Sequence, residues 1–232
     1  MRTILIGERY RELLEAALTK YGYEVVWLPD NPKIDPRLAG HADLNAFAGK
    51  KKLYISSHIC QDTYIVNQLT NKRLQVEAVS VAGMYYPDDA ALCAAEIGGR
   101  LYHKPSITAP ALLEAYNDNV VSVHQGYAGC AVCSVTADAL ITADAGIARA
   151  AKIYGNDVLL ISGKGFYLEG YAEGFIGGSS FTDYDRKTVF FTGSLVQCPE
   201  KDEILKFIAS HGAKAAFLTD HAAFDIGSAV LL

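Results

Sequence analysis

Short apolar runs alternate with amphipathic stretches along the chain in one recurring order. An apolar run at residues 3–6 precedes a stretch at 8–21 whose apolar positions recur at helical spacing, and a β-rich run follows at 24–28. Gly22 stands where that helix should end, because glycine is favoured just past a helix terminus. The beginning of the chain is therefore predicted to form strand, helix and strand.

The same order returns four more times. Each later unit begins with a segment rich in small residues (HADLNAFAG, AALCAAEIGG, CAVCSVTAD or GFIGGSSF), which adds a leading strand. The repeat is therefore predicted as ββαβ. The strand, helix and strand that follow each leading segment are expected at residues 52–56, 62–69 and 76–81; 100–103, 109–116 and 120–124; 139–142, 144–154 and 157–162; and 188–192, 199–211 and 215–219.

The two ends of the chain complement each other. The first unit lacks a leading strand, whereas the run at 228–232 is a strand without a unit of its own. Pairing 228–232 with 3–6 would complete the first unit and leave no exposed sheet edge. An open α/β domain would explain the helices but neither the hairpins nor these two terminal strands. We therefore expect a single domain over residues 1–232, an α/β fold of five ββαβ repeats closed by the terminal strands into a five-bladed, pseudo-fivefold α/β-propeller. The repeats are expected at about 225–232 with 1–30, 41–81, 90–124, 131–162 and 175–219.

Composition narrows the functional classes. Of the 232 residues, 50% are hydrophobic, which is enough for a full core, and the net charge of -5 argues against a nucleic-acid binder. No apolar run is long enough to span a membrane or to form a signal peptide. Five is an odd number of cysteines for a chain of this size, which argues against a framework of disulfides. A reducing, cytoplasmic location is therefore expected. The chain lacks a nucleotide-binding glycine pattern and has only one C-x-x-C pair, so neither a cofactor nor a metal is predicted.

Gly40-His41-Ala42-Asp43 matches a Gly-His-x-Asp pattern. With the five-unit order, it makes the chain resemble the pentein superfamily of guanidino-group-modifying enzymes, which includes arginine deiminases, amidinotransferases and dimethylarginine hydrolases. The segments HADL, YPDDAALCAAEIGG, HQGYAGCAVC and GFIGG resemble an uncharacterised bacterial group of penteins more closely. The resemblance covers nearly the whole chain in element order.

The resemblance implies a cysteine thiolate that attacks the guanidinium carbon, a histidine that acts as acid and base, and carboxylates that hold the cation. In catalytic members the cysteine lies close to the C-terminus. Here residues 219–232 contain no cysteine, and Ser228 stands near the expected position. Either another cysteine reaches the centre of the fold, or the protein binds a ligand without this chemistry.

The residues nominated for the site come from four parts of the sequence. His41 and Asp43 are two residues apart, so in a strand both would face the central pore. Their alternative roles are a loop hydrogen bond and a turn. Cys130 is nominated as a displaced nucleophile because glycines beside it suggest the mouth of a loop. The nominated catalytic residues are His41, Asp43 and Cys130, and the nominated substrate-binding residues are Asn45, His124, Gln125, Tyr127, Glu173 and Asp225.

The other cysteines have simpler interpretations. Cys93 and Cys133 are expected as small buried side chains in strands, and Cys198 is expected at the start of a helix. Cys60 has no evident partner.

Two functions follow from these patterns. One is a hydrolase or transferase that acts on a small guanidino or amidino compound bound in a central pore. The other is a non-catalytic pentein that binds a small molecule or a protein, as the ribosome anti-association initiation factors do with this architecture. A homodimer is possible in either case, and no nucleic-acid or membrane partner is expected.

Overall fold

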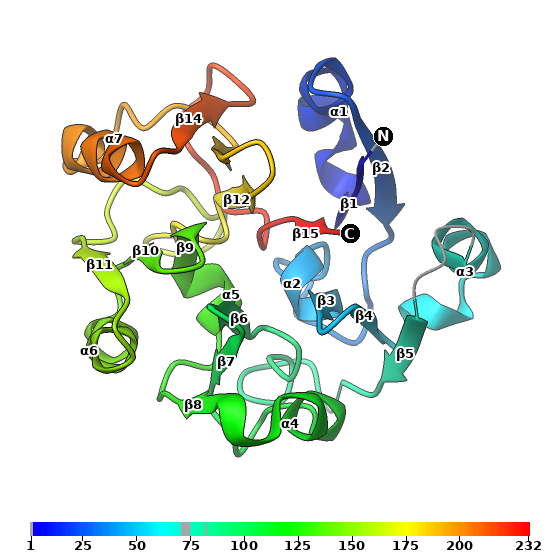
Figure 1. Ribbon diagram of the computed structural model, residues 1–232. Coiled ribbons are helices and arrows are strands. Elements are labelled where there is room, and N and C mark those ends of the chain that lie inside the picture. The colour runs from blue at the N-terminus through cyan, green and yellow to red at the C-terminus, as the bar shows by residue number, and fades with distance from the viewer. Residues whose placement is uncertain (1, 71–74, 82) are drawn as a thin grey trace.

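A computed structural model describes residues 2–70, 75–81 and 83–232. Five three-stranded sheets lie around a common centre, with the longer helices on the outside (Figure 1). In every sheet the middle strand pairs antiparallel with one neighbour and parallel with the other. We number the sheets as units one to five: β15 (Val230–Leu231), β1 (Arg2–Gly7) and β2 (Tyr23–Leu28); β3 (Ala46–Gly49), β4 (Lys52–Ser56) and β5 (Gln75–Val79); β6 (Ala95–Ile97), β7 (Arg100–His103) and β8 (Val120–Ser122); β9 (Val132–Thr136), β10 (Ala139–Thr142) and β11 (Asp157–Leu160); β12 (Ser180–Asp183), β13 (Thr188–Phe191) and β14 (Lys214–Phe217).

One longer helix connects the middle and last strands of each unit. Each buries residues one turn apart, such as Leu14 and Leu18 in the first helix and Ile204 and Ile208 in the last, as the amphipathic pattern predicts. No helix of the described residues is both long and apolar enough to cross a membrane. The helices are α1 (Arg11–Lys20), α3 (Thr63–Thr70), α4 (Pro110–Tyr116), α6 (Ala145–Ile153) and α7 (Lys201–Ser210), with short 3₁₀ turns at Glu8–Tyr10, Ile59–Gln61 and Asn117–Asn119.

The two terminal strands pair with each other. β15 runs antiparallel to β1, with Leu5 opposite Val230 and Ile4 opposite Leu231. Val230 also packs into the apolar cluster that contains Leu5 and Val26. The predicted pairing of the chain ends is therefore confirmed, and the C-terminal strand completes the first unit.

Two short helices at the centre were not predicted. α2 (Ala42–Asn45) and α5 (Ala128–Ala131) each form a single turn immediately before the leading strands β3 and β9. The sequence predicts a strand from His41 and the mouth of a loop beside Cys130, but the small residues of both segments also permit a tight helical turn where neighbouring units meet. This turn changes the direction in which Asp43 and Cys130 project.

Backbone hydrogen bonds join neighbouring units at the centre, and we call the residues that they connect the hub. They link unit one to units two and five, unit five to unit four, and unit four to unit three. The bonds run from Asp43 N to Gly227 O (3.0 Å), from Ser228 N to Gly178 O (2.9 Å), from Gly178 N to Cys130 O (2.9 Å) and from Gly129 N to Cys93 O (2.9 Å).

Candidate functional site

His41 lies at the start of α2, in a loop that Asn45 holds in place. The Asn45 amide donates hydrogen bonds to the carbonyl oxygens of His41 (2.8 Å) and Ala39 (3.2 Å). Its own oxygen accepts a hydrogen bond from Asn31 Nδ2 (2.8 Å). All of these groups are buried. The amide of Asn45 is thus committed to the loop that carries His41, and this placement makes it a positioning residue.

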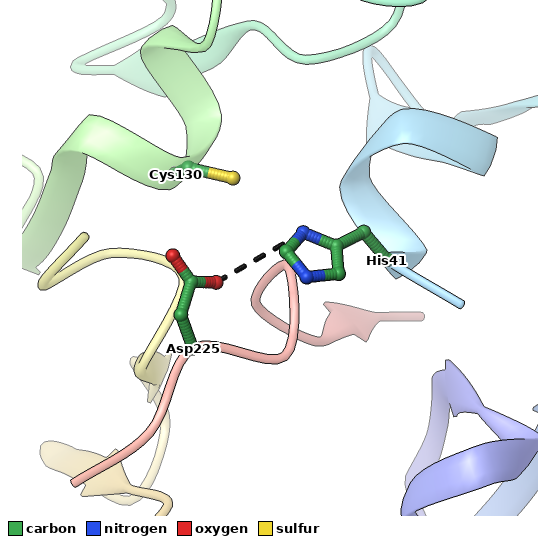
Figure 2. A group of neighbouring side chains, drawn as sticks. All are labelled: His41, Cys130 and Asp225. Atoms are coloured by element: carbon green, nitrogen blue, oxygen red, sulfur yellow. Dashed lines mark ion pairs between the residues drawn. The ribbon is translucent and has the colours of Figure 1, made fainter. Parts of the chain in front are cut away.

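Asp225 approaches His41 from the loop before β15. Its Oδ1 accepts a hydrogen bond from Gly227 N (2.9 Å), and its Oδ2 accepts one from Phe175 N (2.8 Å). His41 Nδ1 lies 4.0 Å from Asp225 Oδ1, and the Cys130 side chain points toward the space between them (Figure 2). The ligand-type atoms of these three side chains all lie within 4.8 Å of one another. Residues from units two, four and one therefore converge at the hub.

Asp43 makes the closest contact with the thiols. Cys130 donates to Asp43 Oδ2 at 2.7 Å, and Cys93 Sγ lies 3.4 Å from the same oxygen. The two sulfur atoms are 3.8 Å apart, and both cysteines are free. The contact between Cys93 and Asp43 connects units three and two at the hub.

Burial dominates the electrostatics of this cluster. It lowers the pKa of His41 to about 3, with a further contribution from Arg9. It raises the pKa of Asp43 to about 7, that of Asp225 to about 6 and that of Cys93 to about 11. The pKa of Cys130 is raised well above its usual value, first by the hydrogen bond with Cys93 and then by burial.

The cluster therefore favours uncharged groups. Within the described part of the chain, no lysine or arginine forms an ion pair with Asp43 or Asp225. A bound cation would reverse this preference, because opposite charge favours the ionised forms of acids and thiols.

Among the residues that the structure describes, two polar atoms of the cluster are buried and find no hydrogen-bond partner. They are Nε2 of His41 and Oδ1 of Asp43. An unpaired buried polar atom typically costs roughly 1–3 kcal/mol, and native proteins tolerate such atoms chiefly where they serve a function. Both atoms therefore have an unused capacity for a hydrogen bond.

A cavity of about 540 Å³ reaches the cluster through one residue. Asp43 lines it, whereas His41, Cys130 and Asp225 do not. Its polar lining includes Lys50 and Glu96 from hairpins of neighbouring units. On the other side, an apolar cluster with Ile34, Leu38, Leu44 and Leu168 packs against the two thiols. The cavity is large enough for a small molecule whose polar end contacts Asp43.

The remaining nominated residues lie in other environments. His124 and Glu173 are exposed, and Glu173 accepts a hydrogen bond from Gly165 N (3.2 Å). Gln125 accepts one from Tyr127 N (3.0 Å), and the Tyr127 hydroxyl donates to Asp89 (2.9 Å). The structure thus brings His41, Asp43, Cys130 and Asp225 together. It leaves His124 on the surface and gives Gln125, Tyr127 and Glu173 contacts elsewhere.

Cys93 is the hub residue whose role the sequence analysis missed. It was expected as a small buried side chain in a strand, and it is buried, but it lies before β6 and faces Asp43 and Cys130. One signal was present: ALC precedes its leading strand much as HADLN precedes β3. Equivalent positions in pseudo-symmetric units converge at the centre, so Cys93 could have been paired with Asp43.

Several solved structures share this fold. A mutant of dimethylarginine dimethylaminohydrolase from Pseudomonas aeruginosa, complexed with citrulline, aligns with a TM-score of 0.58 at 10% identity, covering 100% of this chain and 99% of that one. SxtG, an amidinotransferase from Microseira wollei, aligns with a TM-score of 0.52 at 8% identity over 94% and 88% of the two chains. The cyanobacterial arginine dihydrolase ArgZ gives 0.52 at 11% identity, over 93% of this chain and 36% of that one.

At these identities the similarity shows the fold alone. The neighbours are penteins, and this chain has the pentein fold. No curated protein gives a significant sequence match. A family model does match residues 5–230, nearly the whole chain, and its description is a family of unknown function, DUF6873. The chain therefore belongs to the DUF6873 family.

Proposed function

We propose that this protein is a hydrolase or transferase that acts on a small guanidino or amidino compound, with Cys130 as its nucleophile. The observation that carries the proposal is the contact of 2.7 Å between the Cys130 thiol and Asp43, beside His41 and Asp225. The names of the fold neighbours, a dimethylaminohydrolase, an amidinotransferase and an arginine dihydrolase, give independent support.

The unpartnered oxygen of Asp43 suits a planar cation. A guanidinium or amidinium group donates parallel N–H hydrogen bonds to a carboxylate. Asp43 lines the cavity, so a substrate bound there would direct its cationic end toward this residue. The positive charge would favour the ionised form of Asp43 and of the adjacent thiol.

The first chemical step then uses Asp43 as the base. Its carboxylate takes the proton of the Cys130 thiol, and the sulfur attacks the central carbon, whose C=N electron pair moves to nitrogen. The Asp43 carboxyl returns the proton to the departing nitrogen, and the C–N bond breaks. A cationic amidino group is left on sulfur. A pKa near 7 suits both proton transfers at neutral pH.

Water or an amine completes the reaction. Attack on the sulfur-bound carbon gives a proton to Asp43, and cleavage of the C–S bond with return of that proton regenerates the thiol. Water as the acceptor makes the protein a hydrolase, and an amine makes it a transferase. His41, nominated from sequence as acid and base, is better suited as a neutral hydrogen-bonding residue, because its low pKa makes its protonated form scarce.

The test is covalent labelling with 2-chloroacetamidine in the presence of a chelator. The thiol sulfur bonds to the methylene carbon, chloride leaves and the proton is released. We expect Cys130 to react faster in folded than in unfolded protein, as measured by peptide mass spectrometry. Neutral 2-chloroacetamide is the matched reagent, and it should show no such preference.

Variants test which residues the fast labelling reaction depends on. Cys130→Ser should abolish the fast reaction, and Asp43→Asn should slow it at least tenfold. Cys198→Ser, which alters a buried cysteine before α7, away from the cavity, should leave it unchanged. Equal rates for the two reagents, or a slower reaction in folded than in unfolded protein, would reject the enzyme and favour a ligand-binding pentein.

We further infer that the five units close into a single five-bladed propeller domain, with its ligand at the hub. The pairing of β1 with β15 and the bonds between units support this inference. The cytoplasmic location, the homodimer and the lack of nucleic-acid binding stay predictions from sequence.

A further inference from the structure

We propose that Asp43, Cys93 and Cys130 form a binding site for a divalent transition-metal ion, most suitably zinc. The sequence does not reveal this site, because Cys130 is paired along the chain with Cys133 in a C-x-x-C pattern. In the fold Cys130 faces Cys93 instead, and Cys133 lies apart in β9.

The spacing of the ligand atoms supports the site. Bonds of about 2.3 Å to sulfur and 2.0–2.2 Å to oxygen place two tetrahedral zinc thiolates roughly 3.8 Å apart and a thiolate and a carboxylate oxygen roughly 3.5 Å apart. The two sulfur atoms are 3.8 Å apart, and Cys93 Sγ lies 3.4 Å from Asp43 Oδ2. Only the contact of 2.7 Å between Cys130 and Asp43 must lengthen.

The environment supplies a second argument. Asp43 Oδ1 is fully buried and has no hydrogen-bond partner within residues 2–70, 75–81 and 83–232, so the carboxylate can rotate toward an ion while keeping contact with a thiol. His41 lies beside the site, since one of its ring nitrogens is within 4.8 Å of Cys130 Sγ, and a small movement of the ring toward the thiols would let it serve as a fourth ligand.

The chemistry of the ligands selects the metal. Two thiolates with a carboxylate and an imidazole suit zinc, whereas magnesium and calcium prefer oxygen ligands alone. Binding would replace the two thiol protons by the ion and release them to solvent. The site shares Cys130 with the proposed reaction but does not depend on it.

Cobalt(II) is the probe, because its thiolate complexes absorb in the near ultraviolet and its tetrahedral complexes absorb in the visible. We expect reduced, metal-free protein to bind one cobalt ion per chain with both sets of bands, and zinc to displace it. Cys93→Ser should roughly halve the near-ultraviolet intensity and weaken binding at least tenfold. Cys133→Ser should change neither, and circular dichroism should verify that each variant is folded.

A second measurement does not depend on any variant. Stoichiometric zinc should slow iodoacetamide alkylation of Cys93 and Cys130 in wild-type protein while leaving Cys60 unaffected. The absence of thiolate bands in the wild type, or their equal loss in Cys133→Ser, would overturn the proposal. Chloroacetamidine labelling is carried out with a chelator, so failure of the metal site and failure of the enzyme are read separately.

Discussion

The Sγ atom of Cys130 lies 2.7 Å from Oδ2 of Asp43, although 87 residues separate them in sequence. The contact joins unit four to unit two across the centre, where both side chains are buried. The thiol therefore donates a hydrogen bond to a carboxyl group shielded from solvent, and the protonation state of that carboxyl group has measurable consequences for stability.

Asp43→Asn should stabilise the protein above neutral pH. The pKa of Asp43 is raised to about 7 in the folded state, so its neutral form favours folding at low pH and this contribution is lost as the pH rises from about 4 through 7. Asparagine is neutral throughout. The measurement is urea unfolding in the presence of a chelator. The free energy of unfolding of the variant minus that of the wild type should be larger at pH 8.5 than at pH 5, by up to a few kcal/mol. Asp138→Asn, an exposed change, should show no such pH dependence.

His41 should give stability the opposite dependence on pH: its contribution is lost as the pH falls. Burial lowers its pKa to about 3, so the unfolded chain binds a proton that the folded chain rejects between about pH 6.5 and 3. Wild-type stability should therefore fall over this interval more steeply than that of His41→Gln. The measurement is unfolding free energy at pH 4, 5 and 7, with the exposed His124→Gln as control. Parallel curves for His41→Gln and wild type would show that His41 is accessible to protons.

Gly178→Ala should disrupt the position of Asp225. A Cβ atom at Gly178 would overlap with the Asp225 carboxylate, which Gly227 N and Phe175 N hold in place. We expect a loss of about 1–3 kcal/mol of stability, measured by urea unfolding. Gly146→Ala makes the same change in helix α6, where a Cβ would lie 3.0 Å from Oδ1 of the capping side chain of Asp144, and the small shift needed there should cost less than Gly178→Ala does. Equal stability of the two variants would show that the loop adapts.

Val230→Asp should test the pairing of the chain ends. Val230 lies opposite Leu5 and is only 9% exposed, so a carboxylate there would be desolvated without a partner. The expected loss is a few kcal/mol. Val196→Asp introduces the same charge at a side chain that is 69% exposed and should change the unfolding free energy by less than about 0.5 kcal/mol. A tolerated Val230→Asp would mean that β15 contributes little to the fold.

The fold was predictable because it repeats. Hydrophobic periodicity identifies strands and helices locally, and the unpaired runs at 3–6 and 228–232 implied that the two ends meet, which the register of Leu5 and Val230 confirms. Five occurrences of one order compensate for weak signals in any single unit.

The site was only partly predictable. His41 and Asp43 follow from a short motif, but the contact of Cys93 with Cys130 depends on how α5 orients its single turn, which periodicity does not encode. The exposure of His124 and Glu173 likewise depends on loop conformation, and the composition of a loop says little about the direction in which its side chains project.

Four of the five connections between neighbouring units at the hub are backbone hydrogen bonds, which use no side-chain chemistry. The fifth, between units two and three, is the contact of the Cys93 sulfur with the Asp43 carboxylate. On the proposals above, this contact would respond to protonation and to a bound metal or substrate, whereas the four backbone bonds would not. Evolution could therefore loosen or tighten this one connection through ligand chemistry while the architecture around it stayed constant.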